Sequence, residues 1–462
     1  MNQISMRKLT LMASKVITLS ELREITHMRK SLRTSDFLNF LVILTLVVGG
    51  IWYRHGAFES YSISWQASWQ ATAQILGLYA QLSMIFAIVL ASRAGYLEKA
   101  IGLDNMLVWH RWLGEAAAVF LILHISAEVI ALRFSIGLYQ SILSLTGKQS
   151  YMAQATIGSL GILVVTLTSL KFIRRKLSYE TWYYLHLLVY ASILLGFFHQ
   201  IYLGYDFASD NIAKNFWIGI NVLALTIAIL GRWGGLLISL VNPYIITQVS
   251  RVGTNSTELT LSGKIKKGIP GQFAIIRGLN KDYWWQPHPF SLSSVESNGD
   301  LKFTIRDLGE GSAGFTQMRI GTKVAVEGPY GAITSELLGD KKILMIAGGV
   351  GIAPVRALLS SLDPVNEPIV IYRSGNLNDS PHLNELVEIS TRLHGRVIPV
   401  IGGRETLTKD PFSPQGLKDL VPDIASREVV LCGPELLIDK AVISLIRLKV
   451  PIENIHHERL WW

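Results

Sequence analysis

Two apolar stretches of the chain begin and end with histidine: HRWLGEAAAVFLILH at residues 110–124 and HLLVYASILLGFFH at residues 186–199. The histidines are 14 positions apart in the first stretch and 13 in the second. On helices, each spacing corresponds to roughly 20 Å, which fits inside a hydrocarbon core about 30 Å thick. Two such helices can hold two stacked metal centres, with four predicted ligands: His110, His124, His186 and His199.

Haem is the group that this arrangement favours, because imidazole is its commonest axial ligand and haem carries electrons singly. At 100° per residue, a spacing of 14 falls about 40° short of whole turns, so His110 and His124 share a helix face. A spacing of 13 falls about 140° short of whole turns, so His186 and His199 would not share a face of a straight helix. We therefore expect the second helix to be distorted near Gly196, or its histidines to reach sideways. The alternative is unrelated membrane histidines, although ionisable residues in membrane spans are usually functional.

The composition indicates a multi-domain membrane protein. Half of the 462 residues are hydrophobic and the mean hydropathy is +0.34, with the apolar segments clustered before Asn242. The net charge of +9 does not indicate nucleic-acid binding, because many Lys and Arg flank apolar segments. The single cysteine, Cys432, excludes internal disulfides and cysteine-ligated clusters. We predict six spans, in order: Phe37–Tyr53, Ala71–Ser92, Met106–Leu132, Tyr151–Leu170, Thr181–Tyr205 and Phe216–Leu240.

Positive charge predicts the orientation of a multi-pass protein in the cell membrane. The N-terminal tail, residues 1–36, and the loops at 93–99 and 171–176 are basic and fall on one side of the membrane. Such segments remain in the cytoplasm, so we expect both termini to be cytoplasmic. His110 and His186 then lie near the cytoplasmic face. The tail itself is either a solvated orientation signal or a surface-lying amphipathic helix.

The pattern changes after Asn242 to short alternating segments punctuated by Gly and Pro, which predict an antiparallel β-barrel. From Lys342 the pattern becomes strand, turn and helix, as in α/β nucleotide-binding domains. The glycine turn Gly348–Pro354 lets backbone N–H groups approach a pyrophosphate. We expect four segments: a tail at 1–36, an all-α six-helix bundle at 37–241, a barrel at 242–338 and an α/β domain at 339–462.

The order of four motifs resembles the ferredoxin–NADP reductase superfamily: HPFS at 288–291, GPYG at 328–331, the glycine turn, and CGP at 432–434. With six spans and paired histidines in front, residues 37–462 resemble the ferric reductase/NADPH oxidase family. The resemblance implies two b-type haems, FAD and a nicotinamide dinucleotide.

The resemblance also implies roles for matching residues. The FAD-binding positions would be His288, Pro289, Phe290, Ser291, Arg306 and Ser312, with Ser291 near flavin N5. The nicotinamide dinucleotide would lie at Gly348, Gly349, Gly351, Pro354, Cys432, Gly433 and Pro434. Cys432 would lie beside the nicotinamide; the alternative is a small core residue. A C-terminal aromatic, Trp461 or Trp462, would stack over the flavin; the alternative is a packing tail.

Two arginines bear on the choice of dinucleotide. Arg373 follows the second α/β strand and Arg404 the third, where either could bind a 2′-phosphate or be an ordinary surface residue. We expect NADPH rather than NADH.

The expected activity is electron transfer from cytoplasmic NADPH through FAD and two haems to an acceptor outside. We expect that acceptor to be O₂, giving superoxide, since the outer loops contain only His55 as a metal-binding histidine. A cationic pocket near Arg54 or Arg133 would support this expectation. The alternatives are a reductase of ferric or cupric chelates, and a carrier that donates to a quinone. Donation to a partner protein is possible but is not indicated.

Overall fold

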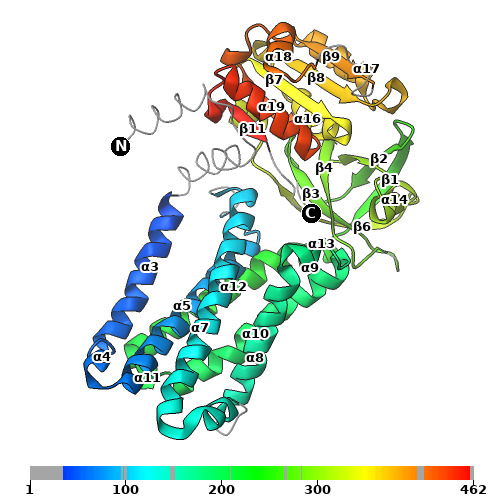
Figure 1. The fold of residues 1–462 in the computed structure, drawn as a ribbon. Coiled ribbons are helices and arrows are strands. Elements are labelled where there is room, and N and C mark those ends of the chain that lie inside the picture. The colour runs from blue at the N-terminus through cyan, green and yellow to red at the C-terminus, as the bar shows by residue number, and fades with distance from the viewer. Residues whose placement is uncertain are drawn as a thin grey trace. The chain divides into compact units, whose positions relative to one another are not determined.

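The computed structural model describes residues 35–94, 97, 101–145, 151–208, 210–264, 268–281, 283–402 and 410–457. The chain forms two compact units (Figure 1), one of Thr34–Leu97 with Asn105–Arg232 and one that includes Trp233–Trp462. The predictions for the tail, Arg404, Trp461 and Trp462 lie outside the described residues.

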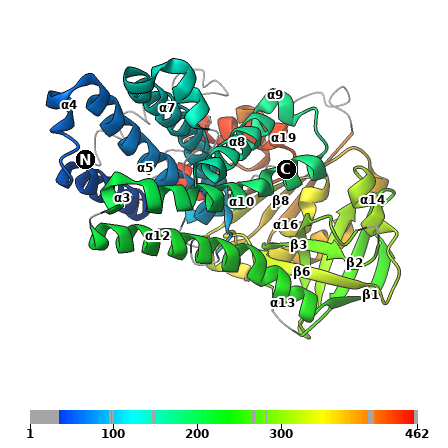
Figure 2. The ribbon, with the colours of Figure 1, turned by 90° about the horizontal axis from the view of Figure 1, so that it is seen from below.

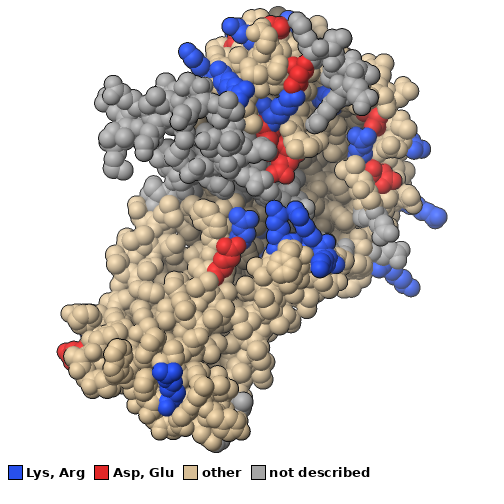
Figure 3. All heavy atoms as spheres, viewed as in Figure 1, with Lys and Arg blue, Asp and Glu red and all other residues tan. Residues whose placement is uncertain are grey.

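Among the described residues, six helical segments are long and apolar enough to span a membrane, which confirms the predicted number. They are α3 (Ser35–Arg54), α5 (Trp65–Ala91), α7 (Leu103–Ser144), α8 (Met152–Ser169), α10 (Tyr179–Leu203), and α12 (Asn211–Ile229) continued through η1 (Leu230–Gly234) and α13 (Gly235–Val241). On the face seen in Figure 3, charged side chains are sparse over these helices, as expected of segments in contact with lipid.

Three helix ends differ from the predicted ones by five or more residues. The second span begins at Trp65, before the predicted Ala71. The third span continues beyond Leu132 as far as a kink at Gly137 (φ 77°, ψ 160°), where it meets a second helix that ends at Ser144. A charged residue such as Arg133 therefore does not end the helix. The sixth begins at Asn211, before Phe216, because the Asp210 side chain accepts the N–H groups of Ile212 and Ala213 at 2.8 and 3.0 Å.

Small residues let α8 and α10 pack closely. A Cβ added at Gly158 would lie 2.7 Å from the Ser192 carbonyl oxygen, and one at Gly161 would lie 2.2 Å from Ser192 Oγ. A side chain at Gly158 would therefore clash with backbone, and one at Gly161 would force the Ser192 hydroxyl to move; small residues are common where membrane helices approach each other.

A buried chain of amides joins α5, α10 and α12. Gln81 Nε2 donates to Asn221 Oδ1 (2.6 Å) and Gln200 Nε2 donates to Gln81 Oε1 (3.2 Å). Trp217 Nε1 in turn donates to Gln200 Oε1 (2.9 Å). Each polar group thus has a partner, which a lipid-embedded bundle requires.

The second unit contains the predicted antiparallel barrel. Its strands are β1 (Tyr244–Arg251), β2 (Ser256–Ser262), β3 (Phe273–Gly278), β4 (His288–Val295), β5 (Leu301–Arg306) and β6 (Lys323–Tyr330). They close in the order β1-β2-β5-β4-β3-β6, and Figure 2 shows β2, β1, β6 and β3 side by side. Leu259, Leu261 and Phe303 are buried at its centre, so the barrel is filled by side chains. A short helix, α14 (Glu310–Thr316), follows β5.

The α/β part is a parallel sheet with strand order β11-β10-β7-β8-β9. Its described strands are β7 (Ile343–Gly348), β8 (Ile369–Ser374), β9 (Arg396–Ile401), β10 (Glu428–Cys432) and β11 (Ile455–His457). The helices between them are α16 (Ile352–Leu359), α17 (Leu383–Arg392), α18 (Pro414–Leu420) and α19 (Glu435–Arg447). The chain therefore has the predicted fold class: a six-helix bundle, an antiparallel barrel and an α/β domain.

Candidate functional site

The four histidines lie in two pairs, each with one ring from α7 and one from α10. The ring centroids of His110 and His186 are 5.8 Å apart, and those of His124 and His199 are 6.5 Å apart. A metal bound by two imidazole nitrogens at about 2 Å each would place the ring centroids roughly 6 Å apart. Both separations suit a metal held between the rings.

The helix α10 is an uninterrupted α-helix from Tyr179 to Leu203, so no distortion occurs at Gly196. The second explanation for the 13-residue spacing therefore applies: His186 and His199 leave the helix on different faces and reach sideways to their partners.

Backbone carbonyls fix the tautomer of the two histidines on α7. His110 Nδ1 lies 2.9 Å from the Ala87 carbonyl oxygen, and His124 Nδ1 lies 2.7 Å from that of Ala73. Because a carbonyl oxygen only accepts, each Nδ1 must carry the hydrogen. Each Nε2 then keeps a free lone pair, as a metal ligand needs.

The two histidines on α10 have different surroundings. His186 Nδ1 lies 3.2 Å from Ser169 Oγ, whereas His199 Nδ1 is buried and has no hydrogen-bond partner among the described residues. A Cβ added at Gly114 on α7 or Gly196 on α10 would meet no other atom, so there is open space one turn from His110 and from His199. Paired rings, free lone pairs and open space fit a haem at each pair.

The barrel brings the HPFS motif onto β4. The His288 ring stacks on Phe290 (centroids 6.1 Å apart, 16° between planes), and Ser291 and Pro289 pair with Phe273 and Ile275 on β3. All four motif residues are half-buried. They could line a flavin, because each remains partly accessible.

Ser312, another predicted FAD contact, lies at the start of α14. Its Oγ accepts the N–H of Leu308 at 2.8 Å and donates to the Gly309 carbonyl at 3.1 Å. The hydroxyl therefore holds this turn in shape in the structure.

Arg306 extends from β5 of the barrel to the α/β part. Its guanidinium forms an ion pair with Asp379, and its Nη1 lies 3.3 Å from where a Cβ would stand at Gly349. Arg306 thus lies at the glycine turn as well as on the barrel. The sequence did not reveal Asp379, which is 73 positions away and stands in no motif.

The glycine turn and the CGP motif approach each other at the carboxyl ends of β7 and β10, which are neighbours in the sheet. A Cβ at Gly351 would lie 2.3 Å from the Cys432 carbonyl oxygen, and one at Gly348 would lie 3.0 Å from Pro434 Cδ. Gly433 has φ 153°, which glycine adopts readily. The structure therefore brings the predicted dinucleotide residues together, with Pro354 buried in α16. The carboxyl edge of a parallel sheet is where such ligands bind.

Arg373 uses its guanidinium on the backbone. Its Nη1 donates to the carbonyl oxygens of Ser374 (2.5 Å) and Val400 (3.1 Å). In this structure the side chain holds β8 against β9.

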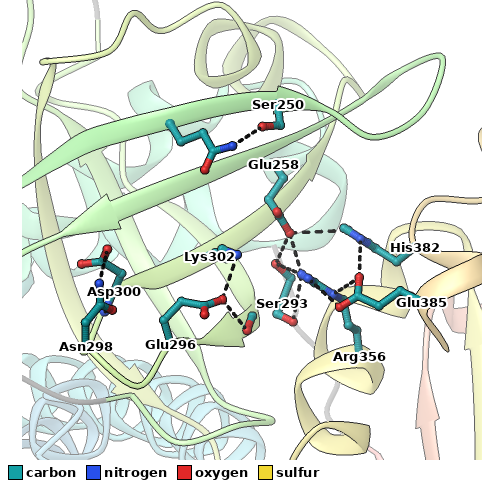
Figure 4. Close-up of polar contacts among 12 residues, drawn as sticks. Ser250, Glu258, Ser293, Glu296, Asn298, Asp300, Lys302, Arg356, His382 and Glu385 are labelled. Carbon is teal, nitrogen blue, oxygen red and sulfur yellow. Dashed lines mark hydrogen bonds and ion pairs between the residues drawn. The ribbon is translucent and has the colours of Figure 1, made fainter. Parts of the chain in front are cut away.

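A buried ionic cluster that the sequence did not predict joins the barrel to α16 and α17 (Figure 4). Arg356 Nη1 lies 2.6 Å from Glu258 Oε2, and its Nη2 lies 2.9 Å from Glu385 Oε1. His382 Nε2 lies 2.9 Å from Thr304 Oγ1. Hydrogen bonds from His382 and Arg356 lower the pKa of Glu385 to about 2. Only the long-range fold brings these groups together, so no local motif could have revealed them.

Fold and site together define a multi-pass membrane protein with a nucleotide-binding domain. Residues 76–197 match the family described as ferric reductase like transmembrane component, and residues 242–334 match an FAD-binding domain. The chain therefore combines a ferric reductase-like transmembrane component with an FAD-binding domain, as in a ferric reductase-type oxidoreductase, and the predicted resemblance is confirmed.

Curated relatives agree with these matches. Ferric reduction oxidase 2 of Arabidopsis thaliana is 26% identical over 64% of this chain and 40% of its own length. Ferric/cupric reductase transmembrane component 2 of Saccharomyces cerevisiae is 23% identical over 57% of this chain and 36% of its own. The electron transfer subunit of dihydroorotate dehydrogenase B (NAD(+)) from Caldanaerobacter subterraneus is 36% identical over 23% of this chain and 41% of its own. The chain thus spans about two fifths of the length of these relatives.

Proposed function

We propose that this chain carries electrons from NADPH, through FAD and two b-type haems, to an acceptor on the opposite side of the membrane. The observation that carries the proposal is the pair of histidine sites at two depths of one bundle, in a chain that continues into an FAD-binding domain. When bound, FAD accepts a hydride and haem carries electrons singly. We divide the roles between residues 37–241 for haem, 242–338 for FAD and 339–462 for the dinucleotide.

The direction of transfer is supported by which end of the bundle continues into the barrel. A Cβ at Gly231 in η1 would lie 2.8 Å from the Ser92 carbonyl oxygen, just beyond the α5 segment that binds His110. Arg232 Nη2 donates to Tyr183 Oη at 2.7 Å, one turn from His186. The His110/His186 pair therefore lies at the end from which the chain leaves for β1. We propose that electrons enter at this pair and leave at His124/His199, with both termini in the cytoplasm.

In this proposal, residues of the barrel and of the α/β part hold and orient the FAD and the nicotinamide dinucleotide. The HPFS segment lines the flavin, with Ser291 toward its reactive edge and Arg306 beside its pyrophosphate. The glycine turn and Cys432 receive the nicotinamide dinucleotide. We propose NADPH on the basis of the two predicted arginines, with Arg404 as the main candidate for the 2′-phosphate because Arg373 Nη1 is bonded to the backbone. Trp461 or Trp462 would cover the flavin until the dinucleotide stacks.

For the acceptor we propose a ferric chelate, and the names of the two ferric reductase relatives support it. A chelate needs no protein ligands, and the described residues contain no group of three or more side chains able to hold a metal ion. Of the two arginines named for a cationic O₂ pocket, Arg54 has a carboxylate partner and Arg133 lies beside an aromatic ring. Arg54 forms an ion pair with Asp210, and the Arg133 guanidinium lies 5.0 Å from the ring centroid of Phe134.

The test is stopped-flow mixing of the purified protein, loaded with haem and FAD, with NADPH and with NADH. We expect NADPH to reduce both haems faster, and a ferric chelate to reoxidise them faster than air does. If reoxidation in air is fast and yields cytochrome c reduction that superoxide dismutase abolishes, O₂ is the acceptor instead.

The ligand assignment needs a separate variant. His124→Ala should remove one haem spectroscopically and leave the other reducible by NADPH. A variant that retains two haems, or a wild-type chain that binds none, would refute the assignment.

A further inference from the structure

Ser169, the last residue of α8, has every hydrogen-bonding position of its hydroxyl engaged. Its Oγ lies 2.7 Å from the Val165 carbonyl oxygen, which can only accept the hydroxyl hydrogen. It also lies 3.3 Å from Trp182 Nε1, which can only donate, and 3.2 Å from His186 Nδ1. With the hydroxyl hydrogen on the shortest contact, the Val165 carbonyl at 2.7 Å, the lone pair that Trp182 does not occupy accepts a hydrogen from His186 Nδ1.

We propose that Ser169 is a positioning residue that fixes His186 in the Nδ1–H tautomer and strengthens it as a metal ligand. The inference rests on the proposed function, since it takes the His110/His186 pair to hold one haem and the His124/His199 pair to hold the other. The bond leaves His186 Nε2 with a free lone pair, as the carbonyl of Ala87 does for His110.

The two histidine pairs then differ in the hydrogen-bond acceptors at their Nδ1 atoms. Both imidazoles of the His110/His186 pair donate from Nδ1 to an acceptor, whereas in the other pair His124 donates to Ala73 and His199 Nδ1 has no partner in the described chain. An acceptor on Nδ1 makes an imidazole a more basic ligand, which favours the oxidised metal. With a metal bound at both pairs, the His110/His186 centre would therefore have the lower midpoint potential, and electron transfer from it to the other centre would be favourable.

The position of Ser169 is itself held by packing. The Trp182 indole lies against the His186 ring, with centroids 5.1 Å apart and 32° between planes, and the Arg174 guanidinium lies 4.6 Å from the Trp182 ring centroid. Trp182 thus keeps both the hydroxyl and the imidazole in place.

The experiment is a redox titration of the full-length protein with both haems bound, followed optically. The His124→Ala variant, which keeps the haem at His110/His186, assigns the two potentials. Ser169→Ala should raise the midpoint potential of the His110/His186 centre by about 59 mV. This shift corresponds to a tenfold change in its one-electron equilibrium constant. The other potential should stay unchanged, and Ser169→Thr should restore the first.

Thr166→Val is the matched control, because Thr166 makes the same kind of hydroxyl-to-carbonyl bond on α8, to Ile162 at 2.8 Å, without an interaction with a histidine. It should leave both potentials unchanged. A Ser169→Ala protein with two haems and unaltered potentials, or one in which the His124/His199 centre shifts instead, would overturn the inference while the proposed function stands.

Should Ser169→Ala fail to fold, Trp182→Phe provides an independent test, in which the midpoint potential is expected to shift in the opposite direction. It keeps an aromatic ring against His186 but removes the N–H that occupies one lone pair of Ser169. Ser169 then accepts more strongly from His186, and the potential of that centre should fall. A rise or no change would count against Ser169 as the acceptor. Failure of the wild-type chain to bind haem would instead refute the proposed function.

Discussion

Arg356 Nη1 lies 2.6 Å from Glu258 Oε2, although the two residues are 98 positions apart. Arg356 is on α16 of the α/β part and Glu258 on β2 of the barrel, and their side chains are only 8% and 12% exposed. Glu385 and His382 complete the cluster from α17 and the turn before it (Figure 4). The two nucleotide-binding parts are therefore joined by the buried Arg356–Glu258 pair, and Glu385 lies at the more exposed edge of the cluster.

Removing the cation should destabilise the second unit strongly. Arg356→Leu leaves the buried Glu258 carboxylate only its longer contacts to His382 (3.6 Å) and Ser293 (3.3 Å). Loss of one partner of a buried ion pair typically costs about 3–5 kcal/mol. We expect an equivalent fall in apparent unfolding free energy, measured by denaturant titration with flavin fluorescence as the probe. Lys302→Met is the control, because the Lys302–Glu296 pair (2.8 Å) is more exposed and should contribute at most about 1 kcal/mol. Equal losses in the two variants would contradict the assigned role of the buried cluster.

The same cluster predicts a pH dependence of stability. Hydrogen bonds from His382 and Arg356 lower the pKa of Glu385 from its ordinary value of 4.5 to about 2. A carboxyl with a lowered pKa stabilises the folded state above its unfolded pKa, and this stabilisation is lost as the pH falls toward 2. The melting temperatures of wild type and Glu385→Gln should differ fully at pH 6 and converge between pH 4.5 and 2.

Glu388→Gln, on the exposed side of the same helix, is the control for that comparison. It should change the melting temperature little at pH 6. A Glu385→Gln difference that stays constant down to pH 2 would show that the carboxylate is not what stabilises the cluster.

A methyl group at position 77 should disturb the His124 site. A Cβ at Gly77 would lie 3.0 Å from His124 Nδ1, which is already bonded to the Ala73 carbonyl, so the ring has little freedom to move. We expect Gly77→Ala to lose most of one haem, as judged by the haem-to-protein ratio and the absorption spectrum. Gly50→Ala, where a Cβ meets nothing within 4 Å, should retain both haems. Two haems in Gly77→Ala with unaltered spectra would contradict the prediction.

The glycine turn offers a test of dinucleotide binding that leaves the membrane domain intact. In Gly351→Ala the new Cβ would lie 2.3 Å from the Cys432 carbonyl oxygen, so backbone must move on one side or the other. NADPH should then reduce the flavin at least tenfold more slowly, whereas dithionite should still reduce both haems. The control is Gly375→Ala, because a Cβ there meets nothing within 4 Å. Normal flavin reduction by NADPH in Gly351→Ala would refute the assignment of this turn.

Local patterns in the sequence predicted most of the fold. Alternation of apolar and polar residues after Asn242 predicted the antiparallel barrel that β1 to β6 form, and the apolar runs located six spans. The alternation did not give the exact strand ends, because these depend on pairing: β6 continues to Tyr330 where it pairs with β3. The sequence did not indicate the three-residue strand β11, because its parallel pairing with β10 and the His456–Glu428 ion pair are long-range contacts.

The sequence likewise indicated some residues of the candidate sites and not others. Histidine spacing indicated which rings could pair, because depth in a membrane follows from position along a helix. It could not indicate Ser169 or Asp379, since their partners His186 and Arg306 come from other elements. Partners of this kind depend on how helices pack and on how the barrel meets the sheet, which no local pattern records.

The hydrogen bond between Gln81 and Asn221 has a consequence for biosynthesis. The two residues are 140 positions apart, so the ribosome, at about 5–20 residues per second, needs roughly 7–28 s to synthesise the partner of Gln81. During that interval the nascent α5 must enter the bilayer with an amide that its final neighbours cannot yet satisfy. Its mean hydropathy of 1.9, among the highest of the six spans, compensates for that polar group. Translocon insertion of α5 therefore relies on its apolar residues, and the Gln81–Asn221 hydrogen bond forms only after the last helix has entered the membrane.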